Sequence, residues 1–368
     1  MKVTSIIFLF ISVAFIIGGL FLMKTGRNAA PNDLAIDGYD YSNDGVITST
    51  VALDEEDITK YAIVLNDCSV VITGNAKDCD FLAPGNAKKS TARLTNFKPN
   101  RYMSSVSGKT YTLSDDISIM DYISFDGTGV KFSGVWQTLL SVYNSYKYKN
   151  DESKEVVIYI SSADQLNQIN INLTNCELSI RGLAGNYDLN VSGTDSKIEI
   201  KDIACSTLSV NGNNTEYSLL NNITTNDLDL TLNGGAVVEN KTSRIIAENV
   251  TAELDGLDAE INIDFRNLIA DVKNGDFSLT TNYAIASYSK NIATKSGSLY
   301  INRENIGSSF ETDKDAVFDG SIVINSETGN IKMNFGSFIL LPEIPDADDP
   351  DESEETDDDT ADTDIAER

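Results

Sequence analysis

From about residue 165 onward, hydrophobic and polar residues alternate along short segments that recur at a nearly constant spacing. Residues 228–232 (LDLTL) and 277–279 (FSL) illustrate the alternation, because every second side chain is apolar. A period of two is typical of β-strands with one buried face. The pattern therefore predicts short strands, each with one side toward a core and the other toward solvent.

Two rows of apolar residues give the length of the repeat, which is about 20 residues, within the range of repeat architectures. The first row consists of Val191, Val210, Leu230, Val250 and Ala270. The second row has the same spacing and consists of Ile198, Tyr217, Val237, Leu257 and Phe277. A coil of this length cannot bury its own apolar side, whereas coils stacked about 4.8 Å apart bury a continuous ladder. The rows predict an all-β fold, a single-stranded-type parallel β-solenoid, with an antiparallel sandwich as the alternative.

Glycines mark the expected corners between these strands. Gly185, Gly212, Gly234, Gly256, Gly275 and Gly297 recur close to one phase of the repeat, usually beside Asn or Asp, which favour turns. Residues 320–335 (GSIVINSETGNIKMNF) are typical of a last strand pair. We expect Phe338–Leu341 to close the end of the stack.

The chain before the repeats is less regular. Residues 61–74 (YAIVLNDCSVVITG) and 154–160 (KEVVIYI) predict strands, and residues 135–148 fit an amphipathic helix or an aromatic hairpin that caps the stack. Together with the segments described below, the predicted domains are an anchor at 1–27, a juxtamembrane linker at 28–50, an irregular β-rich region with a cap at 51–160, the solenoid at 161–341 and a tail at 342–368.

An apolar run from Ile6 to Met23 contains no charged residue. About 18 residues at roughly 1.5 Å each nearly span the hydrocarbon core of a membrane. A cleavable signal peptide has a shorter apolar core, and here only residues 28–30 approximate a cleavage site, several residues too late. We predict an uncleaved single-pass transmembrane helix, with a signal peptide as the alternative, and an Asn- and Thr-rich body outside the cytoplasm.

The composition narrows the classes of function. Lys and Arg total 28 against 56 Asp and Glu, and the net charge of -28 disfavours nucleic acid as a partner. Histidine is absent, which removes the usual general base and the commonest zinc ligand. Four acidic residues are candidates for a carboxylate pair or a calcium site, although solvated faces and corners explain them better: Asp255, Asp258, Glu260 and Asp264. We predict no enzyme, no catalytic residue, no cofactor and no metal site.

Four cysteines, Cys68, Cys79, Cys176 and Cys205, have no metal-type or thioredoxin-type spacing. A two-residue hairpin at Thr73-Gly74 would place Cys68 opposite Cys79, which predicts a disulfide in an oxidising compartment or two small buried apolar residues. Cys176 and Cys205 are separated by about one and a half coils of the predicted repeat, and we expect them not to pair.

Other features carry less information. Residues 342–368 form a low-complexity acidic tail that is expected to be disordered, as a solvating extension or as a contact for a basic partner or calcium. The single tryptophan, Trp136, is expected in the cap. Sequons occur at Asn172, Asn190, Asn213, Asn222, Asn240 and Asn249, and chance accounts for many of them in an Asn-rich chain.

The strand at 154–160, the segments LSIRG, DLNVSG and IEIKDI, and the closing 320–335 segment resemble the bacterial DUF4097 family of putative adhesins. The resemblance covers about residues 150–337 and implies a β-solenoid, an N-terminal membrane segment and a role at the cell surface. It offers no catalytic residues. We therefore predict a membrane-anchored adhesion or cell-envelope interaction protein whose partner is an envelope polymer or a surface protein. The alternatives are a regulatory or envelope-stress component and, third, a carbohydrate-active β-helix enzyme.

Overall fold

The computed structural model describes residues 48–53, 58–82, 89–97, 102–115, 123–126, 129–132, 154–219, 222–238, 245–312 and 317–339. The predicted anchor at 1–27, the cap segment at 135–148 and the acidic tail at 342–368 lie outside these residues. Within the described ranges, no helix has the length and apolar character needed to cross a membrane. The described chain is mostly β.

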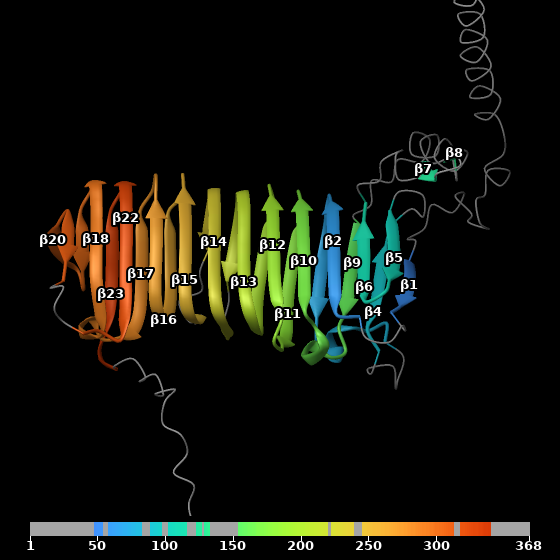
Figure 1. The fold of residues 1–368 in the computed structure, drawn as a ribbon, viewed down its shortest axis with the longest axis horizontal. Helices are drawn as coiled ribbons and strands as arrows, with labels where there is room; N and C mark the ends of the chain where they lie inside the picture. The colour runs from blue at the N-terminus through green and yellow to red at the C-terminus, as the bar shows by residue number, and fades with distance from the viewer. Residues whose placement is uncertain are drawn as a thin grey trace, which may run out of the picture.

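One 21-stranded, mostly parallel sheet winds into an elongated stack, an arrangement consistent with a β-solenoid (Figure 1). Its strands are β1 (Thr48–Ala52), β2 (Lys60–Asn66), β3 (Cys68–Thr73), β4 (Thr91–Thr95), β5 (Met103–Ser107), β6 (Thr110–Ser114), β9 (Lys154–Tyr159), β10 (Gln168–Thr174), β11 (Glu177–Ala184), β12 (Asp188–Thr194), β13 (Lys197–Leu219), β14 (Ile223–Val238), β15 (Ile245–Asp255), β16 (Ala259–Val272), β17 (Phe277–Tyr283), β18 (Tyr288–Ser296), β19 (Leu299–Ile301), β20 (Glu304–Gly307), β21 (Ser309–Glu311), β22 (Gly320–Thr328) and β23 (Ile331–Ile339). A separate hairpin consists of β7 (Ile123–Asp126) and β8 (Gly129–Phe132), and short 3-10 turns are η2 (Ala76–Asp78), η6 (Ala163–Gln165) and η7 (Ile285–Ser287).

Two long ladders run along the stack. In the first ladder, neighbours pair in parallel in the order β6, β2, β10, β12, β13, β14, β15, β16, β22 and β18. The second ladder includes β9, β3, β11 and β13 toward one end, and β16, β17, β23 and β19 toward the other. This parallel pairing favours the predicted solenoid over the antiparallel sandwich.

The predicted register is correct for the first coils and then shifts. Val191 pairs with Val210, and Val210 pairs with Leu230, as the first apolar row predicts. Leu230 then pairs with Ala252 rather than with Val250, and Ala252 pairs with Ala270. The predicted place of Val250 in this row is therefore wrong, and the row returns to phase only because a long step is followed by a short one.

The second apolar row contains the same error. Tyr217 pairs with Val237 as predicted, but Phe277 pairs with Ala259 rather than with Leu257. The physical reason is a longer connection after β14, since the step from Ile223 to its partner Ile245 is longer than the step from Ile203 to Ile223. An insertion of two residues shifts the positions of the next coil without breaking the alternation, and the following shorter step restores the phase at Ala270 and Phe277.

Chain order and spatial order differ at both ends of the stack. The β2–β3 coil lies between β6 and β9 on one side and β10 and β11 on the other. Likewise, the β22–β23 coil lies between β16 and β17 on one side and β18 and β19 on the other. The segment 320–335 is confirmed as a strand pair, but it is internal. The expectation that Phe338 and Ile339 close the stack is therefore wrong; residues 340 and 341 lie outside the described ranges.

Several corners between strands are formed by residues with a left-handed backbone conformation. Gly234 and Gly256 have φ of +63° and +71°, which confirms them as corners, and Asp195 and Asn214 adopt the same conformation in earlier coils. Gly212 instead lies within β13, where an added Cβ would overlap the Tyr217 hydroxyl oxygen. Its predicted corner role is wrong because this glycine makes room for a buried tyrosine ring.

Candidate binding surface

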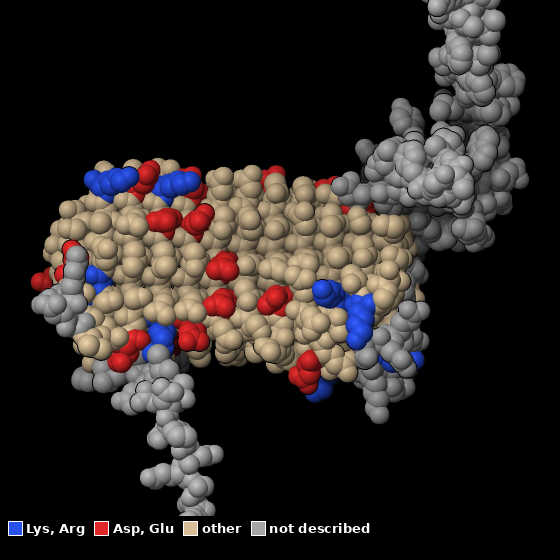
Figure 2. Space-filling view, in the orientation of Figure 1, with Lys and Arg blue, Asp and Glu red and all other residues tan. Residues whose placement is uncertain are grey.

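The outward positions of the first ladder carry mainly uncharged polar side chains. Uncharged residues also cover most of the face of the stack seen in Figure 2. Parallel, in-register pairing places like positions of successive coils side by side. One outward row consists of Asn170, Asn190, Ser209 and Asp229, and the next of Asn172, Ser192, Asn211 and Thr231. This alternation also explains the sequons at Asn172 and Asn190, because Asn and the Ser or Thr two residues later both point outward.

Asn and Asp side chains are linked from coil to coil at the corners. The Asn214 amide donates to Asp195 Oδ1 at 2.6 Å, and the Asn222 amide donates to Asp202 Oδ1 at 2.9 Å. These carboxylates are therefore engaged in holding neighbouring coils together, as expected for buried or corner polar groups.

The acidic residues singled out from the sequence have separate partners. Asp255 accepts from the Asn274 amide at 2.8 Å, and Asp258 accepts from the Asp276 backbone N–H at 2.7 Å. Asp264 is buried and accepts from the Asn282 backbone N–H at 2.9 Å, while Glu260 is exposed on β16. Among the described residues, no group of three or more Cys, Asp or Glu is arranged to hold a metal ion.

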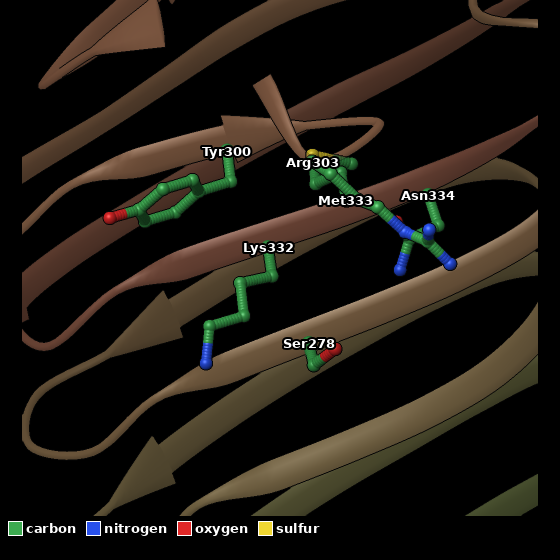
Figure 3. Close-up of a pocket in the computed structure, with 6 residues that line it drawn as sticks. All are labelled: Ser278, Tyr300, Arg303, Lys332, Met333 and Asn334. Carbon is green, nitrogen blue, oxygen red and sulfur yellow. The ribbon is translucent and has the colours of Figure 1, made fainter. Parts of the chain in front are cut away.

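A cleft of about 280 Å³, here called the C-terminal cleft, lies on the second ladder near the β18–β20 end of the stack (Figure 3). Ser278 of β17 pairs with Lys332 of β23, and Lys332 pairs with Tyr300 of β19, so three adjacent strands contribute. The complete lining is Ser278, Tyr300, Arg303, Lys332, Met333 and Asn334. Sequence reasoning missed this site because β23 reaches it from the end of the chain.

The β19–β20 hairpin fixes one wall of the cleft. Its two-residue turn, Asn302-Arg303, has φ of +48° and +73°. The Asn302 backbone N–H donates to the Met333 carbonyl at 2.8 Å, and Asn302 Oδ1 accepts from the Phe335 N–H at 2.7 Å. Arg303 is exposed at the tip, and its guanidinium has no acidic partner among the described residues.

The second cation of the cleft is partly neutralised. Lys332 Nζ lies 3.1 Å from Asp276 Oδ2, and both side chains are partly exposed. The Asn330 backbone N–H, which donates to Asp276 at 2.7 Å, is the main reason that the pKa of Asp276 lies below its ordinary value, and Lys332 adds to this effect. The cleft therefore combines one cation without an acidic partner among the described residues, one paired cation, a tyrosine, and amide and hydroxyl groups.

The hairpin expected at Thr73-Gly74 is wrong, and with it the geometry behind a Cys68–Cys79 disulfide. β3 pairs in parallel with β9 and β11, and the chain after it enters η2. Cys79 packs against Val157 and Tyr159, whereas Cys68 lies beside Cys176. All four cysteines are free thiols, and Cys205 lies at another corner, where burial raises its pKa to about 11.

Comparison with known proteins gives a family match. The model of the family described as Toastrack DUF4097 matches residues 123–334. Similar solved structures are a putative adhesin from Bacteroides fragilis NCTC 9343 (14% identity, 79% of this chain and 98% of that chain, TM-score 0.44) and a putative cell adhesion protein from Clostridium sporogenes ATCC 15579 (12%, 79% and 99%, TM-score 0.18). A third is a putative lipid binding protein from Parabacteroides distasonis ATCC 8503 (10%, 79% and 97%, TM-score 0.27). No curated protein matches the chain. Because the family model covers more than half of the sequence, the chain belongs to the toastrack DUF4097 family.

Proposed function

We propose that this protein is a non-enzymatic cell-envelope interaction protein that binds an acidic polysaccharide through the C-terminal cleft. In this proposal residues 6–23 anchor the chain in the cell membrane and the β body lies outside the cytoplasm. The observation that carries it is the exposed Arg303 guanidinium, which has no acidic partner among the described residues and lines the same cleft as Tyr300 and Lys332. The net charge of -28 disfavours nucleic acid, and it repels any other polyanion at long range as well.

The chemistry of the cleft suits an acidic sugar. A guanidinium offers a planar fork of donors that matches a carboxylate or phosphate group, and a lysine adds a second positive charge. Tyr300 is partly exposed and offers an aromatic face for the apolar side of a sugar ring. Ser278 and Asn334 supply uncharged polar groups for sugar hydroxyls.

The net charge bears on how the ligand is recognised. A chain with a charge of -28 repels polyanions at long range, so binding depends on contacts within the cleft rather than on steering. A charge-assisted hydrogen bond contributes about 1.5–3 kcal/mol, which corresponds to roughly 10- to 100-fold in affinity. Loss of Arg303 is therefore expected to remove most of the affinity.

The test is a binding measurement with the full chain in nanodiscs of uncharged lipid. Immobilised polygalacturonate is the acidic polymer, and dextran is its neutral counterpart. Arg303→Ala and Lys332→Gln are expected to weaken binding to polygalacturonate by about tenfold or more. Lys60→Gln is the matched control, because Lys60 is an exposed lysine of β2 near the other end of the stack.

Two results would overturn the proposal. One is equal binding of the native chain to polygalacturonate and dextran. The other is unchanged affinity of Arg303→Ala for polygalacturonate while its thermal unfolding matches that of the native chain.

A further inference from the structure

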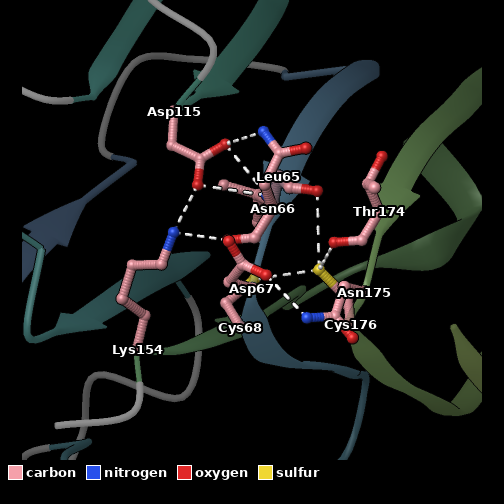
Figure 4. A network of polar contacts seen from close by, with 9 residues as sticks. All are labelled: Leu65, Asn66, Asp67, Cys68, Asp115, Lys154, Thr174, Asn175 and Cys176. Carbon is pink, nitrogen blue, oxygen red and sulfur yellow. Dashed lines mark hydrogen bonds and ion pairs between the residues drawn. The ribbon is translucent and has the colours of Figure 1, made fainter. Parts of the chain in front are cut away.

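Two cysteines far apart in the sequence lie side by side where the inserted β2–β3 coil meets the β10–β11 coil (Figure 4). The Sγ atoms of Cys68 and Cys176 are 3.5 Å apart, although 108 residues separate them along the chain. They occupy equivalent positions of adjacent coils, since Asn66 pairs with Thr174 before them and Ser69 with Glu177 after them.

This placement suits a covalent link. Neighbouring parallel strands lie about 4.8 Å apart, within the roughly 4.4–6.8 Å between Cα atoms that a disulfide requires. The corner is also held by an adjacent contact, in which the Asn175 amide donates to Asp67 Oδ1 at 2.6 Å. Little movement of the backbone is therefore needed to join the two sulfurs.

The two thiols differ in their surroundings. The Cys176 thiol lies 3.2 Å from the Thr174 carbonyl oxygen, to which it can donate. The hydrogen bond from Cys68 lowers the pKa of Cys176, although burial acts in the opposite direction, and the same bond together with burial raises the pKa of Cys68. Charged groups that act on Cys68 include Lys154 and Asp115, which pair with each other at 2.6 Å.

An oxidant can approach from one side. Cys176 borders a shallow groove of about 580 Å³ that runs over four coils, with Glu177, Ser196 and Lys197 among its lining residues. Both thiols are buried, and of the two only Cys176 lines this groove. A small disulfide reaching the groove would therefore meet Cys176 first.

We propose that Cys68 and Cys176 are a modification site that forms a reversible disulfide between the inserted coil and its neighbour. The oxidant is a small-molecule disulfide such as oxidised glutathione. The Cys176 thiolate attacks one sulfur of the oxidant and releases one thiol. Cys68 then loses its proton and attacks Cys176 Sγ of the mixed disulfide, which releases the second thiol. Two electrons and two protons thus pass from the protein to the oxidant.

The link fastens the coil that is most remote in sequence from its neighbours. β2 and β3 reach the stack out of chain order, so they contact β10 and β11 by lateral pairing without being joined to them by a short connection of the chain. A disulfide that closes a 108-residue loop restricts the unfolded chain strongly. We therefore expect oxidation to raise the midpoint of thermal unfolding of the full chain by about 10 °C.

Peptide mapping tests the proposal directly, because trypsin separates all four cysteines. Cleavage after Lys and Arg yields 61–77 with Cys68, 78–88 with Cys79, 155–181 with Cys176 and 202–241 with Cys205. The full native chain is incubated with oxidised or reduced glutathione, alkylated, and digested without reduction. The expected product of oxidation is peptide 61–77 linked to peptide 155–181, with Cys79 and Cys205 alkylated, and reduced glutathione should reverse the link.

Two variants show whether the link requires this particular pair of cysteines. Cys205→Ser is the matched control, since it removes a buried thiol from another corner, and it should retain both the link and the thermal shift. Cys176→Ser should lose both. The proposal is overturned if the oxidised native chain links any other pair of cysteines, or if all four cysteines remain open to alkylation after unfolding.

Discussion

Replacing Arg303 with glycine is expected to stabilise the protein while weakening its binding of an acidic polysaccharide. Arg303 has a φ of +73° and follows Asn302, whose φ is +48°. A two-residue hairpin with two left-handed residues favours Asn-Gly, because an L side chain is strained at the second position. An arginine at this position lowers the stability of the fold. If its side chain binds a ligand, the benefit of the arginine is in binding rather than in stability.

The magnitude follows from two opposing terms. Relief of a left-handed conformation is worth about 1–2 kcal/mol per residue. Glycine also gives the unfolded chain more freedom, which costs about 0.4–1 kcal/mol. The exposed Arg303 side chain has no acidic partner among the described residues, so its removal loses little. The expected net stabilisation is about 0.5–1 kcal/mol, or roughly 2 °C in the unfolding midpoint.

The assay is urea unfolding of the full chain followed by circular dichroism, together with binding to immobilised polygalacturonate. Arg303→Ala serves as the control that separates charge from strain, because alanine keeps the left-handed strain and loses the guanidinium. Glycine should raise stability and lower affinity, whereas alanine should lower affinity only. A glycine variant that is less stable than the native chain, or that binds as tightly, would refute this reasoning.

Two further predictions concern the core and the edge of the cleft. Gly212→Ala should lower the free energy of unfolding by about 1–3 kcal/mol, measured by urea unfolding, because its Cβ would overlap the Tyr217 hydroxyl oxygen; unchanged stability would contradict the packing described. The Asn330 backbone N–H and then Lys332 lower the pKa of Asp276 in the folded state. The ionised carboxylate therefore stabilises the fold at pH values above the unfolded-state pKa. This contribution disappears as the pH falls through the folded-state pKa. Asp276→Asn should therefore be less stable than the native chain near about pH 7, and the difference should vanish in acid; a difference independent of pH would argue against the shift.

Local alternation was enough to predict the strands of the repeats. Burial of one face requires an apolar residue at every second position, and residues 228–232 satisfy this within a single strand. The mean repeat length could also be predicted from the sequence, because the long step from Leu230 to Ala252 and the short step from Ala252 to Ala270 cancel. The exact partner of Leu230 could not be predicted, because Val250 and Ala252 are both apolar and both fit the alternation.

The order of coils in space could not be predicted from such patterns. An apolar ladder residue packs equally well against any other coil of the same shape. The alternation of β22 and β23 therefore does not indicate that they lie between β16 and β17 on one side and β18 and β19 on the other. The cleft depends on that order, because Lys332 lies between Ser278 and Tyr300 only when β23 is inserted. The pairing of Cys68 with Cys176 depends on the corresponding insertion at the other end.

The inserted coils also have a mechanical consequence for the ends of the stack. In a simple solenoid the terminal coil has one neighbour and frays from its free side. Here β2 and β3 have partners on both sides, as do β22 and β23. Releasing either coil requires the loss of two ladders at once. The proposed disulfide thus joins a coil whose position is fixed from both sides, and Lys332 brings to the proposed ligand site a side chain from the other such coil. Geometry set by distant residues is best maintained on such coils.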